Sequence, residues 1–379
     1  MKKIAIIGST GSIGRQTINV VLQNPDKFEV ISLAGGSNVG VFNEQLSLIK
    51  PKVATFINEK GVDLENNKNT DFYFGENSFI NAIISEADII VIALVGYKGI
   101  VAVLDAIKKG KNIALANKES LVVGGELVTK LAKEKGVSIR PIDSEHSAVW
   151  QALSFDFNKP FNKIILTCSG GAFRDFDSKK LETVKAQDAL KHPNWLMGNK
   201  ITVDCATLVN KAFEVIEAKW LYGTTFDKID VIIHRESIIH SMVEYVDGSV
   251  MAQMSYPSME LPIQIALGYP ERFSSSLNYL DFASISKLTF EKLDDKRFPC
   301  FNLVVESGKR GGCYPAIANG ANDLAVKLFL ENKIGYSDIY KAIAHALDGA
   351  NLEYDGSFEC LERANDYAIN SVKKLFGEQ

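Results

Sequence analysis

The amino-acid sequence predicts an α/β fold that continues into an α+β part and a helical carboxyl-terminal part. From residue 3 to about 140, short β-branched apolar runs alternate with helical patterns, which is typical of a parallel sheet covered by helices on both faces. From about 144 to 265 strand patterns surround one strong helix, and from about 295 helical periodicity dominates. We therefore expect a parallel-sheet domain at 1–143, an α+β domain at 144–265, a connector at 266–294 and a small α-helical domain at 295–379.

The individual elements follow from the same patterns. The expected strands of the first part are KIAII, FEVISLA, VATF, ADIIVIAL, NIALA and VSIRPI, with helices such as SIGRQTINVVLQN and ESLVVGGELVTKLAKEKG between them. The α+β part contains the expected strands KIILT, KITVD, KIDVIIH, HSMVEYV and SVMAQMSYP and the helix TLVNKAFEVIEAKWLYG. After the connector YPERFSSSLNYL, helices are expected at PAIANGANDLAVKLFLENK, YSDIYKAIAHALDG and CLERANDYAINSVKKLFG.

Composition and charge exclude several classes of function. The chain has 42 basic and 46 acidic residues, a net charge of −4 and no block of like charges, so nothing favours a nucleic-acid or membrane-surface partner. The most apolar window, ADIIVIALVGYKGIVAVL, is broken by Gly96, Lys98 and Gly99, and Gly8 interrupts the apolar run at the start. Five scattered cysteines without a C-x-x-C pair indicate a reduced, cytoplasmic compartment.

The stretch GSTGSIG, residues 8–14, directly follows the first expected strand and opens the first expected helix. Glycines in this context permit a tight turn and close approach of a pyrophosphate to the helix amino terminus, which predicts a Rossmann-like dinucleotide-binding domain. The spacing is G-x-x-G-x-x-G, and a glycine-rich turn without a ligand is the alternative. The second strand ends in ISLAGGSN, without the acidic residue that binds the ribose of NAD, which favours NADP, although Ser37 offers no positive charge.

Two carboxylates flank a serine in PIDSEHSAVW, where an extended segment gives way to a helix. One interpretation is helix capping, because Asp143 or Ser144 can accept hydrogen bonds from the first free N–H groups. The other is a metal site, in which Asp143 and Glu145 point to the same side of an extended segment as two hard oxygen ligands.

The helix expected from Thr207 to Tyr222 adds a third carboxylate. On one stripe Asn210, Lys211 and Glu214 stand three and four residues apart, so their side chains meet. A surface Lys–Glu pair is the alternative. Together with the Asp-x-Glu turn, Glu214 would complete a set of oxygen ligands without histidine or cysteine, which suits Mg²⁺ or Mn²⁺ better than zinc. The adjoining stripe is apolar and expected to be buried: Val209, Phe213, Ile216 and Trp220.

Three further segments carry candidate binding residues. LANKESL, residues 115–121, places Asn117, Lys118 and Glu119 at the carboxyl end of the fifth expected strand, the rim of a cofactor cleft, or else at a capped helix start. CSGGAFR, residues 168–174, is a turn that could hold an anion through backbone N–H groups and Ser169, but the bare pattern is weak. KHPNWLMGNK, residues 191–200, is either a lid over a ligand or a loop whose Trp195 packs onto the core.

Taken in order, these motifs closely resemble the 1-deoxy-D-xylulose 5-phosphate reductoisomerase family. The matching segments are GSTGSIG, NKESLV, DSEHSA, SGG-FR, HPNW-MG, NK-FEVIEA, HSMVEY-DGSV and YPA-ANGANDLAV, and they span the chain almost completely. The resemblance implies an enzyme that rearranges and reduces 1-deoxy-D-xylulose 5-phosphate to 2-C-methyl-D-erythritol 4-phosphate, in isoprenoid precursor biosynthesis by the non-mevalonate pathway. Its α+β domain would be catalytic, its substrate a small phosphorylated sugar, and the family is typically homodimeric.

The resemblance also implies roles for individual residues of this sequence. NADPH would be bound by the positions Thr10, Gly11, Ser12, Ile13, Gly36, Asn38, Asn117, Glu119 and Gly198. The divalent cation would be held by Asp143, Glu145 and Glu214. The backbone of the substrate would be contacted by Lys118, Ser144 and His192, and its phosphate by Ser169, Asn210 and Lys211, with the Trp195 loop closing as a flap.

The implied chemistry agrees with these residue types. A Lewis-acidic metal would chelate a ketone and its neighbouring hydroxyl during a retro-aldol cleavage, and NADPH would reduce the rearranged aldehyde. Candidates for the proton transfers are Lys118 and a metal-bound water oriented by Glu145. His192 and the three carboxylates complete the predicted catalytic set.

The sequence departs from the family pattern at three positions. Cys205 in DCAT stands where a serine normally binds the substrate phosphate, and a thiol is a poorer donor. Ser37 occupies a position that is often basic, and Ala172 one that is usually proline. Two other classes of function remain open from sequence: a metal-independent semialdehyde or homoserine-type dehydrogenase, and a non-enzymatic NADP-sensing protein.

Overall fold

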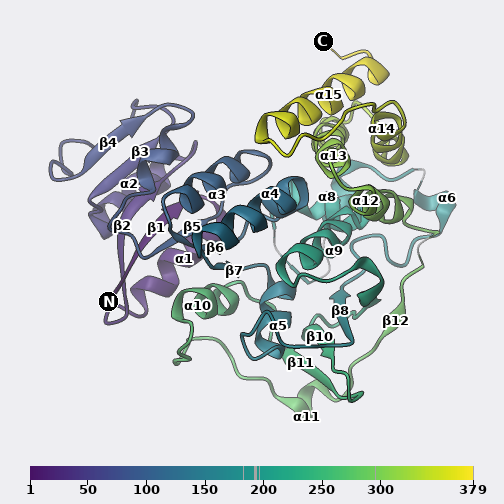
Figure 1. Ribbon diagram of the computed structural model, residues 1–379, viewed down its shortest axis with the longest axis horizontal. Coiled ribbons are helices and arrows are strands. Elements are labelled where there is room, and N and C mark those ends of the chain that lie inside the picture. Colours follow the sequence, from purple (N-terminus) through teal and green to yellow (C-terminus); the bar gives the residue numbers. More distant parts are fainter. Residues whose placement is uncertain (182, 192–193, 196, 295, 379) are drawn as a thin grey trace. The chain divides into compact units, whose positions relative to one another are not determined.

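The computed structural model describes all of residues 1–379 except 182, 192–193, 196, 295 and 379 (Figure 1). The chain forms two compact units, each of which is assembled from separate stretches of sequence. The first unit contains Met1–Ser120, Val128–Ser147 and Ser258–Leu277; the second contains Leu121–Leu127, Ala148–Pro257 and Asn278–Gln379. The predicted α/β fold with an additional sheet and helices is confirmed. The predicted division into four segments, at 1–143, 144–265, 266–294 and 295–379, stays a prediction.

The first unit is built on a seven-stranded sheet with the order β4-β3-β2-β1-β5-β6-β7, in which every pair of neighbouring strands is parallel. Its strands are β1 Lys2–Ile7, β2 Phe28–Ala34, β3 Val53–Phe56, β4 Asp71–Phe74, β5 Ile89–Ile92, β6 Asn112–Leu115 and β7 Ile139–Pro141. The edge strand β4 was not predicted. Its exposure alternates along DFYF, and such a short, half-exposed run gives a weak signal.

Helices connect these parallel strands, as the crossover geometry requires. The connecting helices are α1 Ser12–Leu22, α2 Val39–Ile49, the 3₁₀ turn η1 Ser78–Ala82, α3 Lys98–Lys108 and α4 Glu119–Lys135, and α5 Ser144–Ala152 follows the last strand, β7. The core between sheet and helices contains residues such as Ile4, Leu33, Phe42, Leu46 and Val91, all fully buried. The carboxyl ends of the strands meet at one edge, so the residues that follow β1, β2, β5, β6 and β7 are brought together there.

A later segment of the chain returns to the first unit as helix α10, Glu260–Gly268, and packs on α1. The carboxyl-terminal carbonyls of α10 are bound by cations. Lys2 Nζ donates to the carbonyls of Leu267, Gly268 and Tyr269 at 3.0, 3.0 and 2.8 Å, and Arg140 donates to Ala266 at 3.0 Å. These contacts satisfy groups that a helix end otherwise leaves unbonded and oppose the negative end of its dipole.

The second unit has a five-stranded sheet with the order β11-β10-β8-β9-β12. Only β8 and β9 run parallel; the other neighbours are antiparallel. The strands are β8 Lys163–Cys168, β9 Ile229–Ile233, β10 Ile239–Glu244, β11 Val250–Met254 and β12 Glu291–Lys292. Four of the five predicted strands of this region are therefore confirmed.

The predicted strand KITVD at 200–204 is wrong, because this segment lies in helix α8, Asn199–Thr207. Its β-branched residues Ile201, Thr202 and Val203 favour a strand locally. In the structure Lys200 and Asp204 form an i, i+4 ion pair of 2.8 Å, and α8 packs against the carboxyl-terminal helix α13. Tertiary contacts that a local pattern cannot reveal decide the conformation here.

The remaining helices of the second unit cover the sheet and form a bundle. The strong helix predicted at 207–223 is observed as α9, Val209–Leu221, and it packs against α12, Pro299–Arg310. The bundle continues with α13 Tyr314–Leu330, α14 Tyr336–Asp348 and α15 Phe358–Phe376, the last drawn in yellow in Figure 1. Short helices α6 Ser178–Leu181, α7 Ala186–Ala189 and α11 Phe282–Ile285 and the 3₁₀ turn η2 Phe226–Lys228 lie in connections. Among the described residues no helix is both long and apolar enough to cross a membrane.

Candidate active site

The glycine-rich turn lies at the topological switch point of the parallel sheet. Strand β1 pairs with β2 on one side and β5 on the other, so the loops after β1 and β5 diverge from a common point. Gly8 has φ +95°, and a Cβ on it would lie 2.6 Å from the carbonyl oxygen of Ala93, directly after β5. A Cβ on Gly14 would collide with the backbone of Gly8 and Ser9. The turn is therefore closed by backbone contacts that only glycine permits.

This turn fits a pyrophosphate. Helix α1 begins after Gly11 without a side-chain cap, which leaves its first N–H groups for an anion. Thr10 Oγ1 accepts a hydrogen bond of 3.3 Å from the backbone N–H of Gly36, so the turn is tied to the loop after β2. The predicted cofactor residues Thr10, Gly11, Ser12, Ile13 and Gly36 thus lie at one end of the sheet.

The loop after β2 is where the adenosine ribose of a dinucleotide is recognised in this fold. Ser37 and Asn38 are exposed there, and Asn38 Oδ1 accepts a hydrogen bond of 3.1 Å from Val41 and caps α2. The sequence from Ala34 to Asn38 contains no carboxylate. The site therefore lacks the group that would repel a 2′-phosphate.

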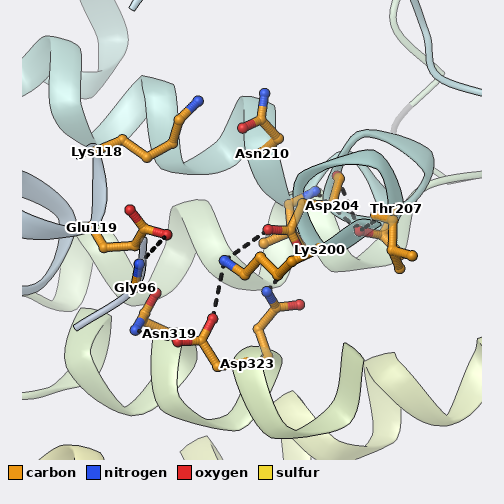
Figure 2. Close-up of polar contacts among 12 residues, drawn as sticks. Gly96, Lys118, Glu119, Lys200, Asp204, Thr207, Asn210, Asn319 and Asp323 are labelled. Carbon is orange, nitrogen blue, oxygen red and sulfur yellow. Dashed lines mark hydrogen bonds and ion pairs between the residues drawn. The ribbon is translucent and has the colours of Figure 1, made fainter. Parts of the chain in front are cut away.

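Asn117 and Glu119 follow β6 and form hydrogen bonds with the backbone of the loop after β5. Asn117 Nδ2 donates to the carbonyls of Leu94 and Gly96, both at 3.0 Å, and to Glu119 Oε2 at 2.9 Å. Glu119 accepts a hydrogen bond of 3.3 Å from the backbone N–H of Gly96, as Figure 2 shows. Asn117 also accepts from the backbone of Ser120, so it caps the start of α4 as well. The capping interpretation is therefore confirmed for Asn117, and the role of Asn117 and Glu119 at the rim of a cofactor cleft stays a prediction.

Lys118 and the Asp-Ser-Glu turn lie side by side at the ends of β6 and β7. Lys118 Nζ is 2.8 Å from Asp143 Oδ2, and their side chains are only 10% and 13% exposed. Ser144 Oγ donates to Glu145 Oε2 at 2.5 Å. Helix α5 starts at Ser144, so Glu145 belongs to its first turn. The extended geometry predicted for these two residues is wrong, because the helix begins between them, but a carboxylate oxygen of Asp143 still lies within 4.8 Å of one of Glu145, as the predicted ligand pair requires.

Glu214 is deeply buried on α9, and the two neighbours predicted from spacing do contact it. Asn210 Nδ2 donates to Glu214 Oε1 at 2.6 Å, and Lys211 forms an ion pair with Glu214 Oε2. The side chains of Lys211 and Glu214 are 3% and 1% exposed. The alternative of a solvated surface pair is thus wrong. A carboxylate buried this deeply stays ionised only where positive charge or hydrogen-bond donors compensate it.

The anion turn after β8 packs directly on helix α8. Gly170 and Gly171 have φ of +84° and +70°, and a Cβ on Gly171 would collide with the carbonyl of Cys205. Ser169 Oγ accepts a hydrogen bond of 3.2 Å from the N–H of Gly171, and Arg174 donates to the carbonyl of Ser169 at 2.9 Å. The structure therefore places the Ser169 turn against Cys205, which is half-buried on α8.

The turn at Leu208 joins α8 to the helix that bears Asn210 and Lys211. Leu208 has a φ of +58° and ends α8 immediately before α9. The predicted phosphate residues thus lie in three contacting segments of the second unit: Ser169 in the turn after β8, Cys205 on α8, and Asn210 and Lys211 on α9.

The predicted flap is described in part. His192 lies outside the described residues. Trp195 faces His240 with ring centroids 6.2 Å apart, and Gly198 precedes the first turn of α8. Asn194 Nδ2 donates to the carbonyl of Arg235 and to Ser237 Oγ, both at 2.7 Å. Sequence reasoning missed this anchor, because no local pattern links residue 194 to the turn after β9.

The donor atoms of the two units suit the predicted ligands. Asp143 and Glu145 in the first unit and Glu214 in the second offer carboxylate oxygens only, which fits a hard cation such as Mg²⁺ or Mn²⁺. The closed glycine turn with its uncapped helix fits a dinucleotide.

Comparisons with known proteins agree with these features. Family models for 1-deoxy-D-xylulose 5-phosphate reductoisomerase match residues 4–125, and models of its C-terminal domains match 139–222 and 254–372. The 1-deoxy-D-xylulose 5-phosphate reductoisomerase of Chlorobium limicola is 48% identical over 382 residues, with 100% of both chains covered. Two solved structures also cover 100% of both chains. The Zymomonas mobilis enzyme in complex with NADPH is 35% identical with a TM-score of 0.91, and a DOX-P reductoisomerase in complex with NADPH, fosmidomycin and magnesium is 33% identical with a TM-score of 0.92.

The resemblance predicted from the ordered motifs is thereby confirmed over the full length of the chain. The chain belongs to the 1-deoxy-D-xylulose 5-phosphate reductoisomerase family.

Proposed function

We propose that this protein converts 1-deoxy-D-xylulose 5-phosphate to 2-C-methyl-D-erythritol 4-phosphate, with NADPH and a divalent cation, in the non-mevalonate route to isoprenoid precursors. The observation that carries the proposal is the full-length similarity to a reductoisomerase whose structure holds NADPH, fosmidomycin and magnesium. The overall change is an isomerisation of the carbon skeleton followed by addition of a hydride and a proton to the resulting aldehyde.

Asp143, Glu145 and Glu214 would hold the cation. When bound, Mg²⁺ or Mn²⁺ supplies Lewis acidity to the neighbouring oxygens of the substrate. The buried position of Glu214 supports its assignment, since an ionised carboxylate at 1% exposure needs strong compensation. Lys118 beside Asp143 can hydrogen-bond a substrate oxygen or transfer a proton to it. Ser144 adds a hydroxyl at the same turn.

The phosphate of the substrate would bind between the Ser169 turn and the start of α9. Backbone N–H groups of a turn with two left-handed glycines form an anion-binding concavity, and Lys211 adds positive charge. Asn210 and Cys205 would complete the shell, with His192 and the Trp195 loop above the sugar. Closure of that loop would exclude water from the reacting carbons.

The cofactor would lie along the carboxyl edge of the parallel sheet. The pyrophosphate would contact Thr10, Gly11, Ser12 and Ile13, and the loop after β2 would accept the 2′-phosphate near Gly36 and Asn38. Asn117, Glu119 and Gly198 would surround the nicotinamide end. The absence of a carboxylate from residues 34–38 supports NADPH as the cofactor. Ser37 offers no positive charge to a 2′-phosphate, which limits the preference for NADPH over NADH. Steady-state kinetics with each cofactor measure the size of this preference.

The alternatives predict different behaviour. A metal-independent semialdehyde or homoserine-type dehydrogenase would keep its activity in a chelator, and an NADP-sensing protein would bind the cofactor without turnover. Family membership favours neither.

The assembly we propose is a homodimer in the cytoplasm. Strand β11 is an edge of its sheet, and Val246, Val250 and Met251 on or beside it are exposed. An unpaired apolar edge is a surface that a second copy can cover. All five cysteines are free thiols in the structure, as a reducing compartment favours. Light scattering on wild type and on Met251→Lys tests the dimer, because a lysine at this edge should yield monomers.

The decisive experiment is incubation of the protein with NADPH, Mg²⁺ and 1-deoxy-D-xylulose 5-phosphate while absorbance at the nicotinamide band is followed. We expect absorbance to fall only when all three are present, and EDTA to abolish the decrease. NADPH oxidation that is unaffected by EDTA would support the metal-independent alternative instead.

A further inference from the structure

Helix α8 is bound to helix α13 of the carboxyl-terminal bundle by several polar contacts. Lys200 Nζ lies 2.8 Å from Asp204 on its own helix and 3.0 Å from Asp323 on α13, as drawn in Figure 2. Asn322, also on α13, donates from Nδ2 to Asp204 Oδ1 at 2.8 Å. Asp204 is thus held by one donor from each helix.

The charges of this set make the amide of Asn322 important. Asp204 is 2% exposed, and Lys200 is shared between the carboxylates of Asp204 and Asp323. Loss of one donor from a buried carboxylate costs more than a surface hydrogen bond, because water cannot replace the donor. Asn322 is itself 0% exposed and cannot move away without a change in packing.

The residues next to Asp204, at the carboxyl-terminal end of α8, make further contacts. The carbonyl of Cys205 abuts Gly171 of the anion turn, and Tyr336 on α14 donates from its hydroxyl to the carbonyl of Ala206 at 2.8 Å. Burial raises the pKa of Tyr336, so its hydroxyl keeps the proton that it donates. A shift of α8 would therefore displace Cys205 from the turn.

We propose that Asp204 and Asn322 are positioning residues for the phosphate site. Through them the carboxyl-terminal bundle sets the place of α8 and hence the spacing among the Ser169 turn, Cys205 and the start of α9. The inference rests on the proposed function, because that function supplies the phosphorylated substrate. It goes beyond the proposed function in one respect: the affinity for phosphate depends on a contact between α8 and α13.

The test compares Asn322→Leu with wild type. Leucine has a similar volume but no donor, so α13 should fold while Asp204 loses a partner. We expect inorganic phosphate to bind about tenfold more weakly, measured by calorimetry on the full chain, and the KM for 1-deoxy-D-xylulose 5-phosphate to rise about tenfold. The kcat should change much less, and the KM for NADPH should stay the same.

The exchanged pair Asp204→Asn with Asn322→Asp restores one hydrogen bond in the reverse direction and should recover part of the phosphate affinity.

A matched control separates positioning from a general loss of stability. Val372→Ala on α15 opens a buried position of the same bundle and should lower the unfolding temperature without changing phosphate affinity. Unchanged phosphate affinity in folded Asn322→Leu, or an equal loss in Val372→Ala, would overturn the inference. If the wild-type protein binds phosphate but turns over no substrate, the proposed function is wrong. The difference in phosphate affinity between wild type and Asn322→Leu then still tests the inference.

Discussion

Lys118 and Asp143 form an ion pair of 2.8 Å between the segments that follow β6 and β7. Both side chains are largely shielded from solvent, so the lysine charge acts on Asp143 with little screening. The same carboxylate is a proposed ligand of the divalent cation. Lys118 would therefore have two opposing effects. Its charge weakens binding of the cation at Asp143, and its ammonium group hydrogen-bonds the substrate or transfers a proton to it.

Lys118→Met should separate these two effects. We expect Mn²⁺ to bind several-fold more tightly, since a nearby positive charge is removed, and the kcat to fall by about 10²- to 10³-fold, since a proton-transfer candidate is lost. Titration with Mn²⁺ followed by its electron paramagnetic resonance signal measures the first effect, and steady-state turnover the second. Lys98→Met, which removes a side chain that is 56% exposed, is the control and should leave both unchanged.

Glu214→Gln tests the third carboxylate. The amide keeps the shape and one acceptor oxygen for Asn210 but removes the charge, so the cation should bind more weakly and turnover should fall at least about a hundredfold. Glu271→Gln removes a carboxylate that is 71% exposed and should behave as wild type. Wild-type turnover in a folded Glu214→Gln protein would reduce Glu214 to a structural partner of Lys211.

The sequence predicted most of the parallel sheet, because the strands β1, β2, β3, β5 and β6 are largely buried and each is a compact apolar run; the half-exposed edge strand β4 was missed. It also predicted the contacts of Glu214, because helical spacing alone brings residues 210, 211 and 214 together. It failed at 200–204, where β-branched residues suggested a strand. The helix there depends on α13, more than a hundred residues later in the chain.

The contact between Asn322 and Asp204 could not be predicted either, because it joins segments that are far apart in the sequence. No local pattern marks one asparagine of ANGANDLAV as the partner of Asp204. The start of α5 between Asp143 and Glu145 illustrates a smaller limit. The alternation of side chains along an extended segment does not apply to two residues between which a helix begins.

Cys205→Ser examines the departure from the family pattern. The thiol lies beside the anion turn, and a hydroxyl is the better hydrogen-bond donor. We expect activity to be retained and the KM for the substrate to stay the same or decrease, measured by NADPH oxidation at several substrate concentrations. Gly171→Ala is the contrasting variant, because its Cβ would collide with the carbonyl of Cys205 and should raise the KM. A large loss of activity in Cys205→Ser would contradict the placement of this residue at the phosphate.

Cys300→Ala tests a consequence of burial for stability at alkaline pH. Burial, with a contribution from the negative charge of Asp204, raises the pKa of the Cys300 thiol to about 12. Below about pH 8.5 the thiol is protonated in both the folded and the unfolded chain, so its contribution to stability is fully present. Above that pH the unfolded thiol ionises while the folded one keeps its proton, and the free energy of unfolding falls by about 1.4 kcal/mol per pH unit until the pH reaches the folded pKa.

We therefore expect the loss of stability between about pH 8 and about pH 10 to be smaller in Cys300→Ala than in wild type, as measured by urea unfolding at both pH values. Ser307→Ala on the same helix is the control. Its buried hydroxyl donates to the carbonyl of Val304 at 2.6 Å and does not titrate in this range, so its removal should lower stability equally at both pH values. Equal pH dependence in wild type and Cys300→Ala would mean that the thiol ionises as readily in the folded chain as in the unfolded one.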